Sequence, residues 1–329
     1  MGLSTEGLPY LKRMAHAVQT SAIAHDMPNS LAVGWSGGVD STALLLGLKS
    51  CGYEVQAWHI DHAWHQYSSQ EAAWLAEQAA AWHIPFLSLR LAASDGRNRE
   101  AVAREGRYRG FQALAEQTGQ CHVALGHHAD DQAETVCLRM LQGAGVMGLR
   151  GMNDVHDMYG LRLYRPLLHV SHQTMMAALH DAGVTYLDDA SNQDVRLKRN
   201  HIRHVMFPAM TACGIDICDF WMRWRQQARR IAAQIEALCE VIPLQQCEGS
   251  CYVAWALWQD LALPVRVQVV QRMYAMLLGS GHVLGRRHLH AIEQWRLHGG
   301  RGGLDLSKSR LSRKEGGLHL QVREASSRL

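Results

Sequence analysis

The sequence contains eight cysteines but no Cys-x-x-Cys pair. The thiols are scattered at Cys51, Cys121, Cys137, Cys213, Cys218, Cys239, Cys247 and Cys251. Paired cysteines are typical of structural zinc sites and redox motifs, and disulfide frameworks belong to small secreted domains. Cys247 and Cys251 could begin a metal site, but no second pair follows at zinc-finger spacing. We therefore expect reduced thiols and neither a zinc ribbon nor a disulfide scaffold.

Long apolar runs are missing as well. No stretch approaches the roughly 20 apolar residues that a membrane helix needs, and the N-terminus lacks the basic and apolar pattern of a signal peptide. The composition is ordinary for a globular protein, with 47% hydrophobic and 19% charged residues. We predict a cytoplasmic protein with no membrane partner, and its 329 residues suffice for two domains.

A strong net charge is also absent, since the formal net charge is only +3. The distribution is uneven, however, because eight lysines and arginines lie between Arg286 and Lys314 beside only two acids, Glu293 and Asp305. Such a run can be an ordinary solvated surface, or it can bind a polyanion by neutralising phosphates. Charge alone leaves these two interpretations open.

Short apolar runs alternate with helical patterns through the first two-thirds of the chain. The predicted strands are 31–35, 55–60, 86–91, 123–126 and 161–164, and the predicted helices are 40–50, 69–82, 99–118, 130–141 and 172–182. This alternation predicts an α/β fold with a doubly wound parallel sheet.

The pattern changes after Pro208. Residues 219–241 fit one long, arginine-rich amphipathic helix, the chain to residue 298 is mainly helical in pattern, and short strands follow Gly302. We place a domain boundary near residue 210. The sequence thus predicts a first domain over 1–210 and a mainly helical, basic C-terminal domain over 211–329.

Two glycines, two serines and a carboxylate lie within the sequence SGGVDS, residues 36–41, where the first predicted strand leads into a helix. This SGGVDS loop lacks the lysine of a Walker A loop and the G-x-G-x-x-G pattern of a dinucleotide fold. A strand-to-helix turn exposes backbone N–H groups and the positive end of the helix dipole, which bind phosphate. Gly37 and Gly38 allow close approach, and Asp40 can hold Mg²⁺ against a phosphate. A glycine-rich turn without a ligand is the alternative.

The SGGVDS loop resembles the pyrophosphate loop of the N-type ATP pyrophosphatases. This resemblance implies an adenine-nucleotide alpha-hydrolase-like fold and a reaction that splits ATP into AMP and pyrophosphate while a substrate is adenylated. The nucleotide-binding residues that it implies are Ser36, Gly37, Gly38, Val39, Asp40, Ser41, His59 and Asp61, with Mg²⁺ on Asp40. The loop by itself indicates a reaction class and no substrate.

Further motifs follow in order along the chain. They are HIDHAWH (59–65), NREAVAREGRYRGF (98–111), GHHADDQAETVCLRMLQGAGVMGLRGM (126–152), RPLL (165–168) and DDASNQDVRLKRNHIRHVMFP (188–208). Together they resemble the tRNA(Ile)-lysidine synthetase family over essentially all of 31–208, and more loosely beyond. The resemblance implies that the wobble cytidine of an isoleucine tRNA with a CAU anticodon is adenylated, and that free L-lysine then displaces AMP. It makes 1–210 catalytic, makes 211–329 a linker helix with a tRNA-binding domain, and is compatible with a homodimer.

Candidate catalytic residues follow from these motifs. They are Asp40, Arg104, Arg107, His127, Asp131 and Glu134. Asp131 and Glu134 are spaced i, i+3 on one predicted helix face, so the two carboxylates can hold an amino group and accept its proton. By resemblance they recognise lysine and the target cytidine. Arg104 and Arg107 share the same spacing and can stabilise phosphate charge, and His127 can meet the adenylate.

Other interpretations of these residues remain open. The His, Asp and Glu residues between 127 and 134 could bind zinc or a pair of metals, or the acids could simply favour a helix N-terminus. Arg104 and Arg107 could be ordinary surface charge. Arg199, Asn200 and Arg203 could be an active-site or phosphate-binding cluster, or only a solvated turn.

The rival functions are a related enzyme of the same loop class, such as a tRNA thiolase or an amide-forming synthetase, and a nucleotide- or RNA-binding module without catalysis. The sequence also departs from the lysidine synthetase pattern. Ala63-Trp64-His65 replaces the usual Gly-Leu-Arg, which removes an arginine, and Leu197 stands where an aromatic residue is commoner.

Overall fold

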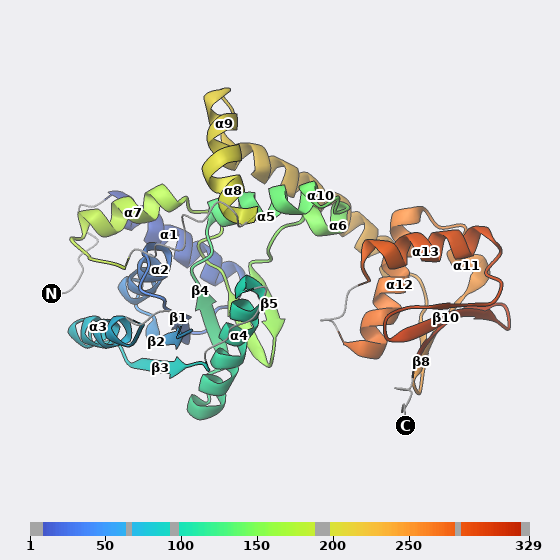
Figure 1. The fold of residues 1–329 in the computed structure, drawn as a ribbon, viewed down its shortest axis with the longest axis horizontal. Helices are drawn as coiled ribbons and strands as arrows, with labels where there is room; N and C mark the ends of the chain where they lie inside the picture. Colours follow the sequence, from blue (N-terminus) through green and yellow to red (C-terminus); the bar gives the residue numbers. More distant parts are fainter. Residues whose placement is uncertain (1–8, 64–67, 93–98, 188–197, 280–283, 324–329) are drawn as a thin grey trace. The chain divides into compact units, whose positions relative to one another are not determined.

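A computed structural model describes residues 9–63, 68–92, 99–187, 198–279 and 284–323 (Figure 1). The chain divides into two compact units, Met1–Gln226 and Gln227–Leu329. Each unit contains a sheet of its own.

The first unit is built on a six-stranded sheet in the order β3-β2-β1-β4-β6-β5. Its strands are β1 Ser30–Gly34, β2 Glu54–Asp61, β3 Phe86–Arg90, β4 His122–Leu125, β5 Val155–Met158 and β6 Leu161–Tyr164. Neighbours pair in parallel except β5, which runs antiparallel to β6. The strand order reverses at β1, because the chain continues to β2 on one side and returns to β4 on the other. Ligands of open parallel sheets bind at the carboxyl ends of the strands at such a switch point.

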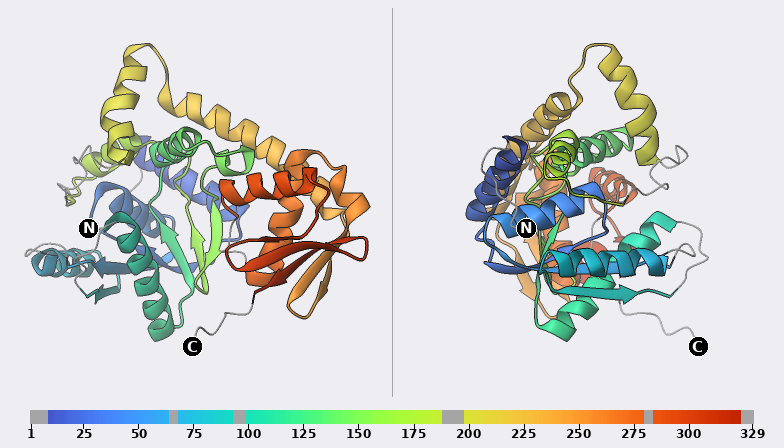
Figure 2. Two further views of the ribbon diagram at one scale, coloured as in Figure 1. Left: turned by 45° about the vertical axis from the view of Figure 1, so that its right-hand side comes forward. Right: turned by 90° about the vertical axis from the view of Figure 1, so that its left-hand side faces the viewer.

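Helices cover both faces of this sheet, as Figure 2 shows. They are α1 Pro9–Ala24, α2 Val39–Ser50, α3 Ser68–Ala81, α4 Arg99–Thr118 and α7 His172–Asp181. Successive strand residues point to opposite faces, so Leu31 and Val33 of β1 join a core with α1, α2, α3 and α7, whereas Ala32 joins a core with α4. The predicted doubly wound α/β fold is confirmed.

A third core lies among the helices that follow β4. The helices are α5 Ala129–Leu141, α6 Val146–Leu149, α8 Lys198–His201, the π-helix η2 Ile202–Met206, α9 Phe207–Ala212 and α10 Ile217–Glu240. Ala133 and Val136 of α5 pack with Phe207 and with Trp221, which is 4% exposed. The first turns of α10 therefore belong to the first unit, and the division at Gln226 lies beyond the boundary that the sequence predicts near residue 210.

The second unit combines helices with a five-stranded antiparallel sheet in the order β7-β8-β11-β10-β9. Its elements are β7 Gln245–Cys247, β8 Ser250–Ala254, α11 Trp255–Gln259, α12 Leu263–Leu278, α13 Arg286–Leu297, β9 Gly303–Asp305, β10 Ser309–Lys314 and β11 Gly317–Val322, together with the end of α10. Trp258, Val269, Met273 and Leu320 are fully buried in its core. The helices agree with the prediction, and β9 and β11 lie at the LDL and LHLQV segments where strands are expected. β7, β8 and β10 are additional.

Gly126, directly after β4, lets the end of this strand lie against the start of α2. A Cβ atom at Gly126 would stand 2.9 Å from the carbonyl carbon of Asp40 and 3.0 Å from both Asp40 O and Ser41 N. These are backbone atoms, which cannot rotate away. The close contact between β4 and the SGGVDS loop therefore requires glycine here.

We expect Gly126→Ala to lower the free energy of unfolding by about 1–3 kcal/mol, because the added methyl overpacks a site with no room to relax. Urea unfolding measures the change. Gly145→Ala is the matched control, since a Cβ atom there would meet nothing within 4 Å. An equal loss of stability in the two variants would show that the contact with the SGGVDS loop is not tight.

Candidate active site

The SGGVDS loop connects β1 to α2 and is held by hydrogen bonds of its own. Ser36 N donates to Ser41 Oγ at 3.2 Å, Ser41 Oγ donates to Gly38 O at 3.1 Å, and Thr42 Oγ1 donates to Gly37 O at 3.2 Å. Gly37 has a φ of +85°, in the left-handed region that favours glycine. The loop is therefore preorganised by its sequence.

The start of α2 is suited to an anion. Gly38 is its N-cap residue and provides no side-chain cap. The N–H groups of a first helical turn have no partner within the helix, and the helix dipole adds positive potential at the same place. The predicted phosphate-binding residues Val39, Asp40 and Ser41 supply this first turn.

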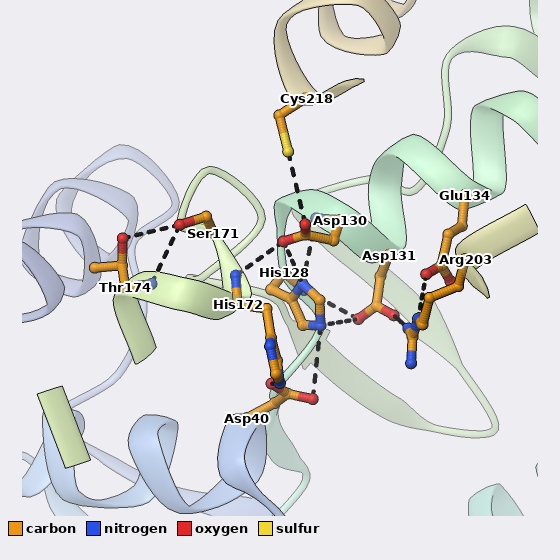
Figure 3. A network of polar contacts seen from close by, with 10 residues as sticks. All are labelled: Asp40, His128, Asp130, Asp131, Glu134, Ser171, His172, Thr174, Arg203 and Cys218. Carbon is orange, nitrogen blue, oxygen red and sulfur yellow. Dashed lines mark hydrogen bonds and ion pairs between the residues drawn. The ribbon is translucent and has the colours of Figure 1, made fainter. Parts of the chain in front are cut away.

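Three carboxylates surround the imidazole of His128 at the carboxyl end of β4 (Figure 3). Its Nε2 lies 3.6 Å from Asp40 Oδ2 and 3.4 Å from Asp131 Oδ2, and its Nδ1 lies 3.2 Å from Asp130 Oδ2. The His128 side chain is buried. It joins the SGGVDS loop to α5, for which His128 is the N-cap residue.

The surrounding charge decides the protonation state of His128. Burial opposes its charged form, but the hydrogen bonds and charges of Asp130, Asp40 and Asp131 prevail and raise the pKa of His128 to about 10. Asp130 N also lies 3.2 Å from Nδ1, yet Nδ1 cannot accept from this N–H and donate to Asp130 Oδ2 at once. We therefore assign His128 as an imidazolium whose Nδ1 donates to Asp130 Oδ2, because three carboxylates favour a cation between them.

His172, the first residue of α7, completes this network and is a residue that sequence reasoning missed. Its Nε2 lies 3.6 Å from Asp40 Oδ1, and its backbone N donates to Asp130 Oδ2 at 2.8 Å. Burial would raise the pKa of Asp130, but the bonds from His128 and His172 lower it to about 2. Ser171 caps α7 by accepting from Thr174 N. This cap is a sequence signal for the helix start, but it carries no information that α7 begins beside Asp40.

Asp131 and Glu134 lie together on α5, and both contact Arg203 of η2. Arg203 Nε donates to Glu134 Oε1 at 2.6 Å, and its Nη2 lies 3.5 Å from Asp131 Oδ1. Glu134 is 1% exposed, and its Oε2 has no hydrogen-bond partner among the described residues. Burial raises the pKa of Glu134, and the nearby Arg203 opposes this shift only in part. Arg203 is thus part of the carboxylate cluster and is not a solvated turn residue.

His127 lies among cations. Burial, with the charges of Arg165, Arg104 and Arg107, lowers the pKa of His127 to about 3, against the opposing effect of Asp131. The imidazole is therefore neutral at pH 7 and can donate or accept one hydrogen bond. Its Nδ1 is buried and has no partner in the described part of the chain. Arg165, from the RPLL motif, is 4% exposed and was not singled out from the sequence.

His59 and Asp61 lie at the end of β2 and organise neighbouring backbone. His59 Nδ1 is 3.0 Å from Trp35 O, directly before the SGGVDS loop. Asp61 is 5% exposed and accepts from Ala63 N at 2.7 Å and from Ser68 Oγ at 3.4 Å. Asp61 thus fixes the turn after β2, whereas its predicted contact with nucleotide stays a prediction. Trp64, His65, Asn98 and the segment 188–197, which includes Leu197, lie outside the described residues.

The donor set is compatible with Mg²⁺ at Asp40. Its Oδ1 is buried and has no hydrogen-bond partner among the residues described, and Mg²⁺ is typically bound by one or two carboxylates plus substrate phosphates. By contrast, no three His, Cys, Asp or Glu side chains in the described ranges are arranged to hold a metal ion by themselves. The alternative of a zinc or two-metal centre between 127 and 134 therefore gains no support.

Among the described residues, no single helix is both long and apolar enough to cross a bilayer. One pair, Lys198–Ala212 and Ile217–Glu240, meets the length and composition test only when joined across a bend of 102°.

Replacing Arg203 tests its electrostatic role. In Arg203→Gln the buried Glu134 loses its cation. We expect the free energy of unfolding to fall by about 1–3 kcal/mol at pH 8. This is less than for a fully buried pair, because Arg203 is partly exposed to water. The folded-state pKa of Glu134 then rises further above its ordinary value of 4.5. The folded state binds the extra proton, so the loss is small below pH 4.5 and grows as the pH rises.

Urea unfolding at pH 5 and pH 8 measures this difference. Adding Glu134→Gln to Arg203→Gln removes the unpaired charge and is expected to recover much of the loss at pH 8. A loss that is the same at both pH values would mean that Arg203 stabilises the protein through packing alone.

Comparison with known proteins agrees with this geometry. A family model described as a PP-loop domain matches residues 11–210. A tRNA(Ile)-lysidine synthase from Chlamydia muridarum is 39% identical over 176 residues, which cover 53% of this chain and 55% of that protein. A tRNA(Ile)-lysidine synthase from Vibrio atlanticus is 35% identical over 259 residues, covering 72% of this chain and 54% of that protein. The chain thus spans about half the length of these curated relatives.

A solved structure shows the same fold at low identity. A U34-tRNA thiolase, NcsA, from Methanococcus maripaludis with its 4Fe-4S cluster aligns with a TM-score of 0.55 and 14% identity, over 68% of this chain and 79% of that one. The relatives confirm the resemblance that the ordered motifs indicate, and the match over residues 11–210 covers more than half of the sequence. The chain belongs to the PP-loop family.

Proposed function

We propose that this protein ligates free L-lysine to C2 of the wobble cytidine in the CAU anticodon of an isoleucine tRNA, with ATP as the activating substrate. The cytidine O2 attacks the α-phosphorus of ATP and pyrophosphate leaves. The ε-amine of lysine then attacks C2, the C2–O bond to AMP breaks, and the amine loses a proton. The products are lysidine, AMP and pyrophosphate.

One observation carries this proposal: the carboxylate pair on α5 is connected to the SGGVDS loop through a single side chain. His128 lies within 3.6 Å of Asp40 and 3.4 Å of Asp131. A cation-binding pair and a phosphate-binding turn therefore share one edge of the sheet. This is what a ligase needs when it activates a base with ATP and then delivers an amine to it.

The SGGVDS loop and its surroundings suit the first step. The free N–H groups at the start of α2 can bind the pyrophosphate portion of ATP, and Mg²⁺ held by Asp40 would neutralise phosphate charge when bound. Arg104 and Arg107 can stabilise negative charge that develops on phosphate. Their charges act on His127, which lies directly before His128 at the end of β4.

The carboxylates suit the second step. Lysine arrives as a cation but must attack as a neutral amine. Asp131 and Glu134 can bind the ammonium group. The buried Oε2 of Glu134, which has no hydrogen-bond partner among the described residues, can accept a hydrogen bond from it. Because burial raises the pKa of Glu134, this carboxylate is a better proton acceptor than an exposed one.

The thiols disfavour the thiolase alternative. Two cysteines lie near the carboxylates, Cys218 with its Sγ 3.8 Å from Asp130 Oδ1, and Cys137 on α5. Burial raises the pKa of Cys218 to about 12 and the pKa of Cys137 to about 11. A reactive cysteine needs the opposite shift. A non-catalytic phosphate-binding module is also disfavoured, since it gains nothing from a buried carboxylate pair.

The tRNA substrate is supported by the names of the curated relatives. The basic run from Arg286 to Lys314, on α13, β10 and the chain between them, supplies cations for RNA phosphates in the second unit. Cytoplasmic residence and a homodimer remain predictions from the sequence.

The test is incubation with Mg-ATP, radiolabelled lysine and bulk bacterial tRNA, scored as acid-insoluble label. We expect label only when ATP and tRNA are both present, and we expect it to survive mild alkali because lysine is joined to a base. Alkali-labile label would indicate an ester, and AMP release with another acceptor but no label would overturn the substrate assignment.

Asp131→Asn and Glu134→Gln are expected to lower the rate of lysine incorporation by roughly 100-fold or more, as the loss of acid–base groups does, while ATP binding persists. Asp157→Asn is the matched control, because its carboxylate on β5 is 74% exposed. Normal lysine incorporation by either α5 variant would refute the roles of these carboxylates.

A further inference from the structure

The face of α5 that carries the catalytic carboxylates continues into a cluster of arginines. Asp131, Thr135 and Arg139 occupy successive turns of one helix face, because residues four apart are neighbours on a helix. Arg199 of α8 donates from Nη2 to Thr135 Oγ1 at 2.8 Å, which brings a second guanidinium to this face. The charge therefore changes from negative to positive over about 6–12 Å of helix.

The two guanidinium groups contact neutral oxygens. Arg139 Nη1 donates to Gly148 O at 2.7 Å and to Gly151 O at 2.8 Å, and Arg199 donates to a hydroxyl. Neither forms an ion pair with a carboxylate in the part of the chain that the structure describes, although the charge of Arg199 helps to oppose the rise in the pKa of Glu134. By contrast, Arg203, four residues after Arg199, pairs with both carboxylates of α5.

Further positive charge gathers around Arg139. Burial, followed by the charges of Arg199, Arg104 and Arg150, lowers the pKa of Arg139. The charges of Arg199, Arg104 and Arg150 therefore act against the charge of Arg139, and an anion beside Arg139 would relieve this repulsion. Arginine is suited to such a role, because its planar guanidinium can donate two parallel hydrogen bonds to one phosphate.

We propose that Arg139 and Arg199 bind an RNA backbone phosphate directly adjacent to the nucleotide that is modified at Asp131 and Glu134. This subsite rests on the proposed function, which places the target base at the carboxylates. Phosphate contacts fix the register of a nucleic acid on a protein, whereas base contacts read its identity. The subsite thus selects which nucleotide of the anticodon loop reaches the carboxylates.

A purely structural role for Arg139 would be to hold the Gly148–Gly151 segment. Gln132 already holds the neighbouring backbone, because its side chain accepts from Met152 N at 2.6 Å and donates to Met152 O at 2.9 Å. Arg199 is the better residue to test, since its one hydrogen bond between described residues is to Thr135.

The experiment uses a synthetic anticodon stem-loop RNA with a CAU anticodon, in which single phosphates of the loop are replaced one at a time by neutral methylphosphonates. Affinities are measured for the wild-type protein, Arg199→Gln and Arg199→Lys. Arg109→Gln is the matched control, because Arg109 on α4 is 70% exposed and pairs with Glu105. Thermal unfolding and ATP binding establish that each variant is folded.

In the wild type we expect neutralisation of one phosphate flanking the target cytidine to weaken binding roughly tenfold, the size of one charge-assisted hydrogen bond. Arg199→Gln should bind the unmodified RNA about tenfold more weakly and be insensitive to that substitution. Arg199→Lys should retain part of the sensitivity, and Arg109→Gln should match the wild type.

Equal sensitivity of the wild type and Arg199→Gln at every position overturns the subsite. The subsite is also overturned if Arg199→Gln removes the sensitivity only at phosphates that are not adjacent to the target cytidine. Neither result affects lysine ligation, which the labelled-lysine assay reports independently. If the wild type incorporates no lysine into any tRNA, the proposed function fails and the subsite fails with it.

Discussion

Repulsion among carboxylates is the physical constraint around which the site is organised. Asp40, Asp130 and Asp131 come from two separate segments, and they share one edge of the sheet because the imidazolium of His128 lies between them. The cation is buried, so its attraction to each carboxylate is weakly screened by water. The SGGVDS loop and α5 are thereby held in a fixed relation, which the proposed function uses to bring phosphate and amine chemistry together.

The backbone makes this arrangement possible before any side chain contributes. The sheet reverses its strand order at β1, so the carboxyl ends of β1 and β4 are neighbours. Gly126 then lets the chain leaving β4 lie against Asp40 without a side chain between them. Beyond this point α5 carries its acids first and Arg139 later. Arg199 and Arg203 of the α8–η2 segment contact the same helix, at Thr135 and Glu134.

The sequence was most informative where one local pattern determined the outcome. Apolar runs such as Leu31–Val33 identified buried strands, and the glycines and serines of the SGGVDS loop identified a strand-to-helix turn, whose phosphate binding stays a prediction. The i, i+3 spacing placed Asp131 and Glu134 on one helix face. His172 could not be found in this way, because its proximity to Asp40 depends on the packing of α7 against α1 and α2.

Short strands were also difficult to predict. β7 has three residues, all exposed, so no alternation of apolar and polar residues reveals it. The first unit ends at Gln226, beyond the boundary predicted near residue 210. In the sequence, Trp221 and Arg225 have the pattern of ordinary residues in an amphipathic helix. Their burial among α5, α9 and the backbone of Arg150 and Met152 is a tertiary effect.

The shared helix α10 has a consequence for how the chain can be divided. Its early turns complete the third core through Trp221, and its later turns bury Ala232, Ile235 and Cys239 within the second unit. A cut before α10 would strip the first unit of part of its core, and a cut after it would do the same to the second. The two units are distinct in their contacts, but no cut at either end of α10 leaves both cores complete, because each unit includes part of this helix.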